Sequence, residues 1–133
     1  MNSPIKFAFV LLAALLAGGC GSQNSGSHSQ DISQTELIKL SETDPSLLIL
    51  DVRTPQEYAQ GHVPKAKLIP HTELKSRLAE INDAKDKTVV VYCKSGYRAG
   101  IAQSILTEAG FTRVMHLDGD MSGWKSAKLP IER

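Results

Sequence analysis

Two apolar segments of strand length constrain the fold of this chain more than any other feature. Ser46–Arg53 (SLLILDVR) and Lys87–Cys93 (KTVVVYC) carry apolar side chains at consecutive positions rather than at alternate ones. Such strands are typical of a parallel sheet whose two faces are both covered by helices. Ala66–Pro70 and Arg113–Leu117 are also expected to be strands.

Helical patterns lie between these strands. Ser33 with Glu36, and Thr54 with Glu57, match the capping-box pattern and predict two helix starts. Apolar residues at helical spacing predict further helices in two segments, 73–81 and 99–109, and a short helix is expected within 118–125. Alternating strands and helices predict an α/β fold, in which sites form at the carboxyl ends of the strands.

The first 19 residues resemble a secretory signal peptide. Lys6 precedes an apolar run, FAFVLLAALLAGG, that is shorter than the roughly 20 residues needed to span a bilayer. The sequence LLAGGC resembles the lipobox of bacterial lipoproteins, in which Cys20 becomes the lipidated first residue. We therefore expect an exported protein, anchored by lipid on Cys20 to a bacterial membrane and facing the periplasm or the cell exterior. Ala17 and Gly19 also suit ordinary signal peptidase, so a soluble periplasmic protein is the alternative.

Residues 20–30 are rich in Ser, Gly and Gln and are expected to form a flexible tether. Residues 31–133 are then one folded domain, and we expect it to be monomeric. The chain has 15 basic and 14 acidic residues, a net charge of +1, which argues against nucleic acid as a partner.

Cys93 is the one cysteine that remains if Cys20 carries lipid. It ends a predicted strand, and a helix is expected to begin near Arg98. An unpaired cysteine in an exported protein is either buried and inert or reactive for a purpose.

The residues after Cys93 favour the reactive interpretation. The unpaired N–H groups at a helix start attract an anion, and Ser95 and Gly96 permit the tight curl that aims several N–H groups at one point. Lys94 and Arg98 add positive charge. Together these features favour the thiolate, which is the nucleophilic form of cysteine.

Three motifs, in the right order, resemble those of the rhodanese (sulfurtransferase) family. Residues 51–66 (DVRTPQEYAQGHVPKA) are similar to its N-terminal signature, 93–98 (CKSGYR) to its active-site loop, and LDGDMSGW with KLP to its C-terminal signature. The resemblance covers about 31–133. It implies a rhodanese-like α/β domain with a central parallel sheet of about five strands, flanked by helices on both faces.

The resemblance also implies a mechanism that needs no metal and no cofactor. The Cys93 thiolate would take the outer sulfur of thiosulfate or a similar small anionic donor, and a thiophilic acceptor such as cyanide or a thiol would remove it from the persulfide. The implied substrate-binding residues are Lys94, Ser95, Gly96, Tyr97, Arg98 and Ala99. The alternative is a non-catalytic binding or persulfide-carrier module. A phosphatase or arsenate reductase is disfavoured, because those relatives have a loop one residue longer.

Asp51, Arg53 and Glu57 invite an acid/base interpretation, but we expect supporting roles. Glu57 should cap its helix, and Arg53 should pair with a carboxylate or a loop carbonyl. The domain's histidines have no metal-ligand spacing, so no metal site is expected; they are His62, His71 and His116.

Two residues depart from the family pattern. Asp120 and Lys128 stand where the C-terminal signature often has glycine. Both are expected near the pocket mouth, with Asp120 close to the anion site.

Overall fold

The structure, a computed structural model, describes residues 30–133. The predicted signal peptide, Cys20 and all of the predicted tether except Gln30 lie outside the described residues. Within the described part, no helix combines the length and apolar character that crossing a membrane requires.

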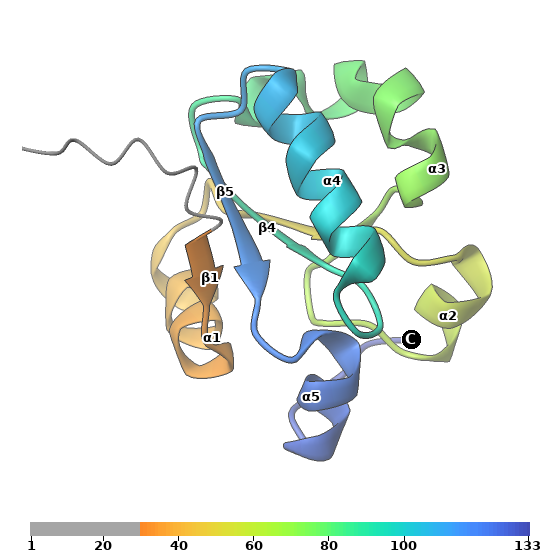
Figure 1. The fold of residues 1–133 in the computed structure, drawn as a ribbon. Coiled ribbons are helices and arrows are strands. Elements are labelled where there is room, and N and C mark those ends of the chain that lie inside the picture. The colour runs from red at the N-terminus through yellow and green to blue at the C-terminus, as the bar shows by residue number, and fades with distance from the viewer. Residues whose placement is uncertain (1–29) are drawn as a thin grey trace, which may run out of the picture.

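Five strands form one sheet in which every neighbouring pair is parallel, in the order β1-β5-β4-β2-β3 (Figure 1). The strands are β1 (Gln30–Ile32), β2 (Leu48–Asp51), β3 (Lys67–Leu68), β4 (Thr88–Tyr92) and β5 (Arg113–Leu117). The expected α/β fold with a parallel, five-stranded sheet is confirmed.

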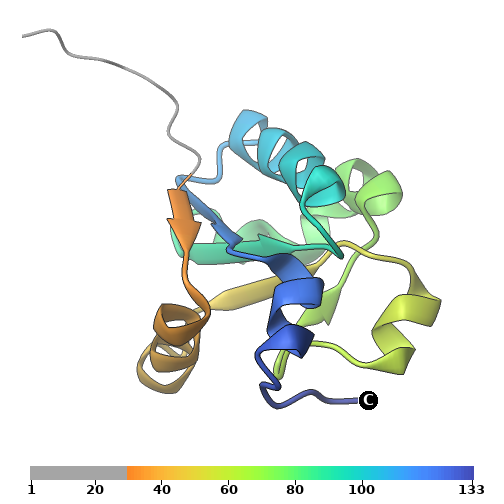
Figure 2. The ribbon, with the colours of Figure 1, turned by 60° about the horizontal axis from the view of Figure 1, so that its bottom comes forward.

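Helices cover both faces of the sheet, as the apolar strands predicted (Figure 2). They are α1 (Gln34–Thr43), α2 (Pro55–Gln60), α3 (His71–Leu74), the 3₁₀-helix η1 (Lys75–Ala84), α4 (Tyr97–Glu108) and α5 (Asp120–Ser126). One core cluster joins the sheet to α3, η1 and α4, and the other joins it to α1 and α5.

The central strand β4 supplies both core clusters because side chains alternate along a strand. Val89 and Val91 face the first cluster, and Val90 and Tyr92 face the second. All four are fully buried. Cys93 continues this alternation on the α4 side, which directs its side chain toward the start of that helix.

Both predicted capping boxes are present. The Ser33 hydroxyl accepts the N–H of Glu36, and the Thr54 hydroxyl accepts the N–H of Glu57. Each glutamate in turn accepts the N–H of its capping residue. The short helix α2 therefore has a defined start, and Glu57 has a defined position on it.

Two elements differ from the sequence prediction. β1 was missed, because three residues of which only Ile32 is buried carry no readable pattern. It forms by pairing with β5, and it begins at Gln30, which had been placed in the tether. The helix expected over 73–81 is α-helical only to Leu74, and Ile81 leaves helical backbone angles (φ −125°, ψ 16°).

Candidate active site

Cys93 lies directly after β4, at the carboxyl end of the central strand. It is a free thiol with 1% of its surface exposed. The N–H of Gly96 donates to its Sγ at 3.0 Å. Gly96 adopts φ +117°, a backbone region that glycine enters easily, and this curls the loop back over the sulfur. Burial alone fits a structural cysteine, but an N–H aimed at the sulfur also suits a thiolate.

The loop runs from Cys93 directly into the first turn of α4. No side chain caps this helix start, so the first N–H groups, from Tyr97 to Ala99, have no capping partner. The methyl group of Ala99 is buried in the core, which leaves its backbone for any contact with substrate. Lys94 and Ser95 are exposed, and the Tyr97 ring is 81% exposed at the tip of the loop.

Arg98 is held by Glu57. Its Nη1 and Nη2 donate to Oε2 and Oε1 at 2.7 and 2.9 Å. These hydrogen bonds are the main cause of a raised Arg98 pKa, to which the Cys93 sulfur adds a smaller contribution. They also lower the pKa of Glu57 to about 2. Arg98 was expected to add positive charge to the loop, and Glu57 balances much of that charge.

Asp120 does not line the cavity, so its expected position at the pocket mouth was wrong, but it does lie close to the Cys93 loop, behind it. It is 2% exposed, and its Oδ1 accepts the N–H of Cys93 at 2.9 Å. The Nε2 of His116 lies 2.9 Å from the same oxygen. The neighbouring N–H groups of Met121 and Ser122 donate to the carbonyls of the first two loop residues. The start of α5 thus clamps the base of the loop.

No role was predicted for His116 from sequence, although its place in the chain carried a signal. His116 is the fourth of the five residues of β5 and pairs with Val91, two residues before Cys93. Because the carboxyl ends of parallel strands meet at one edge of the sheet, a polar residue there is placed beside the Cys93 loop.

Asp51 and Arg53 form a buried ion pair at the end of β2. Arg53 donates through Nη2 to Asp51 Oδ2 at 2.7 Å and to the carbonyl of Gly61 at 2.8 Å, the kind of pairing expected for it. The Tyr92 hydroxyl also donates to Asp51, and its own pKa is raised, first by burial. The pair and Tyr92 tie β2 and β4 to the segment after α2.

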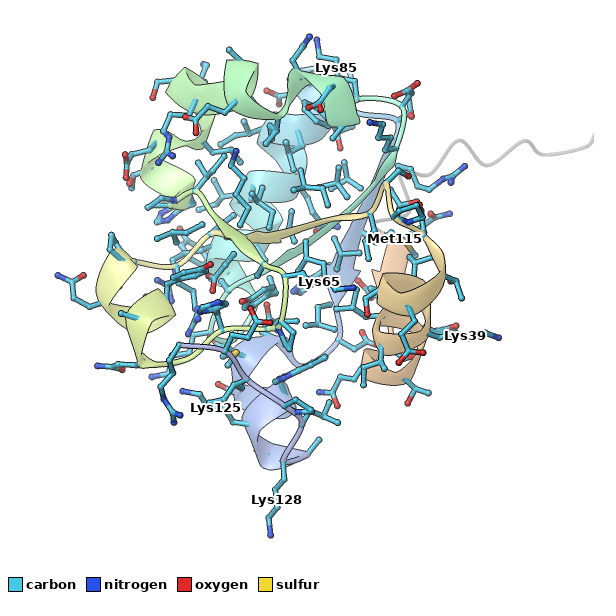
Figure 3. All side chains as sticks on the ribbon, turned by 180° about the vertical axis from the view of Figure 1, so that it is seen from behind. Lys39, Lys65, Lys85, Met115, Lys125 and Lys128 are labelled. Atoms are coloured by element: carbon cyan, nitrogen blue, oxygen red, sulfur yellow. The ribbon has the colours of Figure 1, made fainter. Side chains whose placement is uncertain are left out.

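A cavity of about 170 Å³ opens beside the loop. Its lining combines basic, acidic and neutral side chains: Arg53, Glu57, Gln60, Lys94, Met121, Ser122 and Lys125. Lys128 does not line it; in Figure 3 this side chain extends into solvent beyond the end of α5. The expectation that Lys128 lies at the pocket mouth was therefore wrong.

The other histidines take no part in this cluster. His62 is buried, with its Nδ1 3.0 Å from the carbonyl of Tyr58 and its Nε2 3.7 Å from Glu132. Among residues 30–133, no three His, Cys, Asp or Glu side chains gather in a way that would hold a metal ion.

Comparison with known proteins finds one family match and relatives that are sulfurtransferases. A family model described as "Rhodanese-like domain" matches residues 33–127. A sulfurtransferase of Allochromatium vinosum is 40% identical over 103 residues, which are 77% of this chain and 90% of that protein. The thiosulfate sulfurtransferase PspE of Escherichia coli is 44% identical over 70 residues, 53% of this chain and 67% of that protein.

A solved structure agrees with the observed architecture. A crystal structure of a protein from Lactobacillus plantarum superimposes with a TM-score of 0.68 at 30% identity, covering 79% of this chain and 89% of that one.

Proposed function

The chain belongs to the rhodanese-like domain family, and we propose that it moves a sulfane sulfur from thiosulfate or a similar anionic donor to a thiophilic acceptor through a persulfide on Cys93. Sulfur transfer in general is supported by the family match and by the sulfurtransferase relatives. The donor, the persulfide and the type of enzyme are our proposal.

One observation carries the proposal: the Gly96 N–H donates to Cys93 Sγ at the uncapped start of α4. A sulfur that accepts an N–H there is stabilised as an anion, and a persulfide places its negative charge one atom further into the same curl. Lys94, Ser95 and Tyr97 to Ala99 complete the loop that would hold donor and persulfide.

The reaction has two displacement steps. In the first, the Cys93 thiolate attacks the outer sulfur of thiosulfate, the S–S bond breaks, and sulfite leaves with the electron pair. In the second, cyanide or an acceptor thiolate attacks the outer sulfur of the persulfide. The bond between the two persulfide sulfurs breaks, and its electron pair stays on Cys93 Sγ, which is a thiolate again. No net oxidation occurs, because the sulfur is transferred at the same oxidation level.

The runner-up is a binding or persulfide-carrier module. Its loop would hold an anion or keep the sulfur without rapid release to a small acceptor. The phosphatase interpretation gains no support from the loop, whose six residues curl around a single sulfur atom.

The test is uptake of one sulfur atom by Cys93. The full chain carrying Cys20→Ser, in which Cys93 is the single cysteine, is reduced, mixed with thiosulfate and weighed intact. We expect a gain of one sulfur that cyanide removes and that is absent when Cys93→Ser is added. A folded protein with a reactive thiol but no gain would exclude thiosulfate; a persulfide that no small acceptor discharges would favour the carrier.

For the location, we propose that Cys20 carries lipid and anchors a monomeric domain outside the cytoplasm. Support comes from the LLAGGC pattern alone. Labelling of the expressed chain with radioactive palmitate should be lost in Cys20→Ser. An unlabelled wild-type chain in the periplasmic fraction would instead establish the soluble alternative.

A further inference from the structure

His116 and Asp120 form an enclosed pair directly behind the Cys93 loop. The His116 Nε2 and the Cys93 N–H both lie 2.9 Å from Oδ1 of Asp120. The Asp120 side chain is 3% exposed and that of His116 is 21% exposed. One carboxylate oxygen therefore joins an imidazole to the backbone of the nucleophile.

The pair also lies against the curl of the loop. A Cβ atom on Gly96 would lie 3.3 Å from Oδ2 of Asp120 and 3.5 Å from Cε1 of His116. The N–H of the same glycine donates to Cys93 Sγ. The backbone of one residue thus separates the pair from the sulfur, and charge acts strongly over such a short, poorly hydrated path.

A buried carboxylate in this position disfavours the binding and formation of anions at the loop. Asp120 by itself would place a negative charge behind a thiolate, a persulfide and an anionic donor. A protonated His116 cancels that charge, whereas a neutral imidazole leaves it uncompensated. The protonation state of His116 therefore decides whether the pair carries a net negative charge behind the loop.

Acidic groups on neighbouring elements favour the protonated form of His116. The hydrogen bond to Asp120 is the largest cause of its raised pKa; burial opposes the shift, and the charges of Asp120, Asp31 on β1 and Asp118 before α5 add to it. Asp31 Oδ1 lies 3.8 Å from Nδ1. On the loop side, Arg98 is paired with Glu57 and Lys94 is exposed.

We propose that His116 is a positioning residue for the Cys93 loop: as an imidazolium it neutralises Asp120, so that the loop holds the thiolate and attracts an anionic sulfur donor. The nature of the donor rests on the proposed function; the effect on the thiolate does not.

The test compares two alkylating reagents of similar size and opposite electrostatics. Iodoacetate is anionic and iodoacetamide is neutral, so the ratio of their rates at Cys93 reports the local field, while thiolate content and access cancel. The full chain carrying Cys20→Ser is titrated between about pH 6 and about pH 9. We expect the iodoacetate-to-iodoacetamide ratio to fall roughly three- to tenfold as His116 loses its proton.

Three variants separate charge from structure. His116→Gln should show the low, alkaline ratio at every pH. Asp120→Asn keeps an acceptor for the Cys93 N–H and tolerates the positive φ of 52°, and its ratio should stay near the acidic wild-type value even at alkaline pH. His62→Gln removes another buried imidazole that faces a carboxylate, and it should retain the wild-type fall.

The outcomes also distinguish this proposal from the proposed function. A wild-type ratio independent of pH, or a fall that persists in His116→Gln, would overturn the role of His116. If no sulfur donor loads Cys93 but the iodoacetate-to-iodoacetamide ratio behaves as expected, the proposed sulfur transfer is wrong and the positioning role of His116 stands. If sulfur is taken up and the ratio is flat, only the positioning role fails.

Discussion

Arg98 and Glu57 are joined by two hydrogen bonds, Nη1 to Oε2 at 2.7 Å and Nη2 to Oε1 at 2.9 Å, across 41 residues of sequence. Oε2 also accepts the N–H of Thr54 at 2.9 Å. One carboxylate therefore fixes the start of α2 and the last residue of the Cys93 loop together. The loop is held on this side by a side chain and on the other side by the start of α5.

Arg98→Lys should slow sulfur uptake by Cys93 about tenfold, because one ammonium group cannot span both oxygens of Glu57. The free energy of unfolding should fall by about 1–3 kcal/mol. Rates come from timed intact-mass measurements and stability from urea unfolding.

The matched control for Arg98→Lys is Arg77→Lys. Arg77 also donates two hydrogen bonds to one glutamate, from Nε and Nη2 to Glu80 at 2.6 and 3.0 Å, on the partly exposed surface of η1. Loss of this contact in Arg77→Lys should leave the rate of sulfur uptake unchanged and lower the free energy of unfolding by less than about 1 kcal/mol. If Arg98→Lys took up sulfur at the wild-type rate, the loop would not need the two hydrogen bonds between Arg98 and Glu57.

Stability at acid pH should depend on Glu57. Its pKa is lowered to about 2, mainly by Arg98, with burial opposing and Thr54 assisting. The pKa of Glu57 in the folded state therefore lies below its ordinary value of 4.5. The stability that ionised Glu57 contributes is complete above pH 4.5 and is lost as the pH falls toward about 2. Urea unfolding across this range should show a steeper loss in wild type than in Glu57→Gln.

Glu36→Gln is the control for that titration. Glu36 caps α1 in the same way, but it has no arginine partner and its pKa is lowered only by Ser33. Most of the pH dependence should survive in this variant. Equal losses in both variants would assign the effect to helix capping rather than to the link with the loop.

Gly96→Ala should abolish sulfur uptake. A methyl group would meet Asp120 Oδ2 at 3.3 Å, and φ of +117° is strained for alanine. The loop must then open, and the N–H aimed at Cys93 Sγ moves. We expect a loss of about 1–3 kcal/mol in unfolding free energy, measured by urea denaturation.

Gly110→Ala is the control that measures the cost of backbone strain without a steric clash. Gly110 has φ of +92° but open space around its Cβ position. This variant should be destabilised by strain and still take up sulfur at the wild-type rate. If Gly96→Ala also retains the rate, the curl does not position the sulfur.

Tyr92→Phe should destabilise the domain without slowing sulfur uptake. The hydroxyl donates to Asp51 at 2.7 Å and accepts the N–H of Val63 at 3.1 Å, so its loss leaves buried polar groups short of a partner. We expect a cost of about 1–3 kcal/mol in urea unfolding. A large fall in the rate of sulfur uptake would instead place Asp51 and Arg53 in the chemistry.

Much of the fold was readable because its causes are local in sequence. Ser33 and Thr54 each lie three residues before the glutamate that completes a capping box. The apolar runs around β2 and β4 indicated burial on both faces, and β5 was predicted with its observed bounds. β1 was not readable, because a three-residue edge strand exists only through its pairing with β5.

Local sequence was sufficient to find Cys93 at a strand end, followed by a Ser-Gly curl and a helix start, because these features are neighbours in the chain. The charges that face Cys93 could not be found in this way, because they come from distant segments. Glu57 reaches Arg98 across 41 residues, and Asp120 reaches the Cys93 N–H across 27. Such contacts form because parallel strands and their crossover helices bring distant segments to one edge of the sheet. A local sequence pattern does not show which distant segments will meet there.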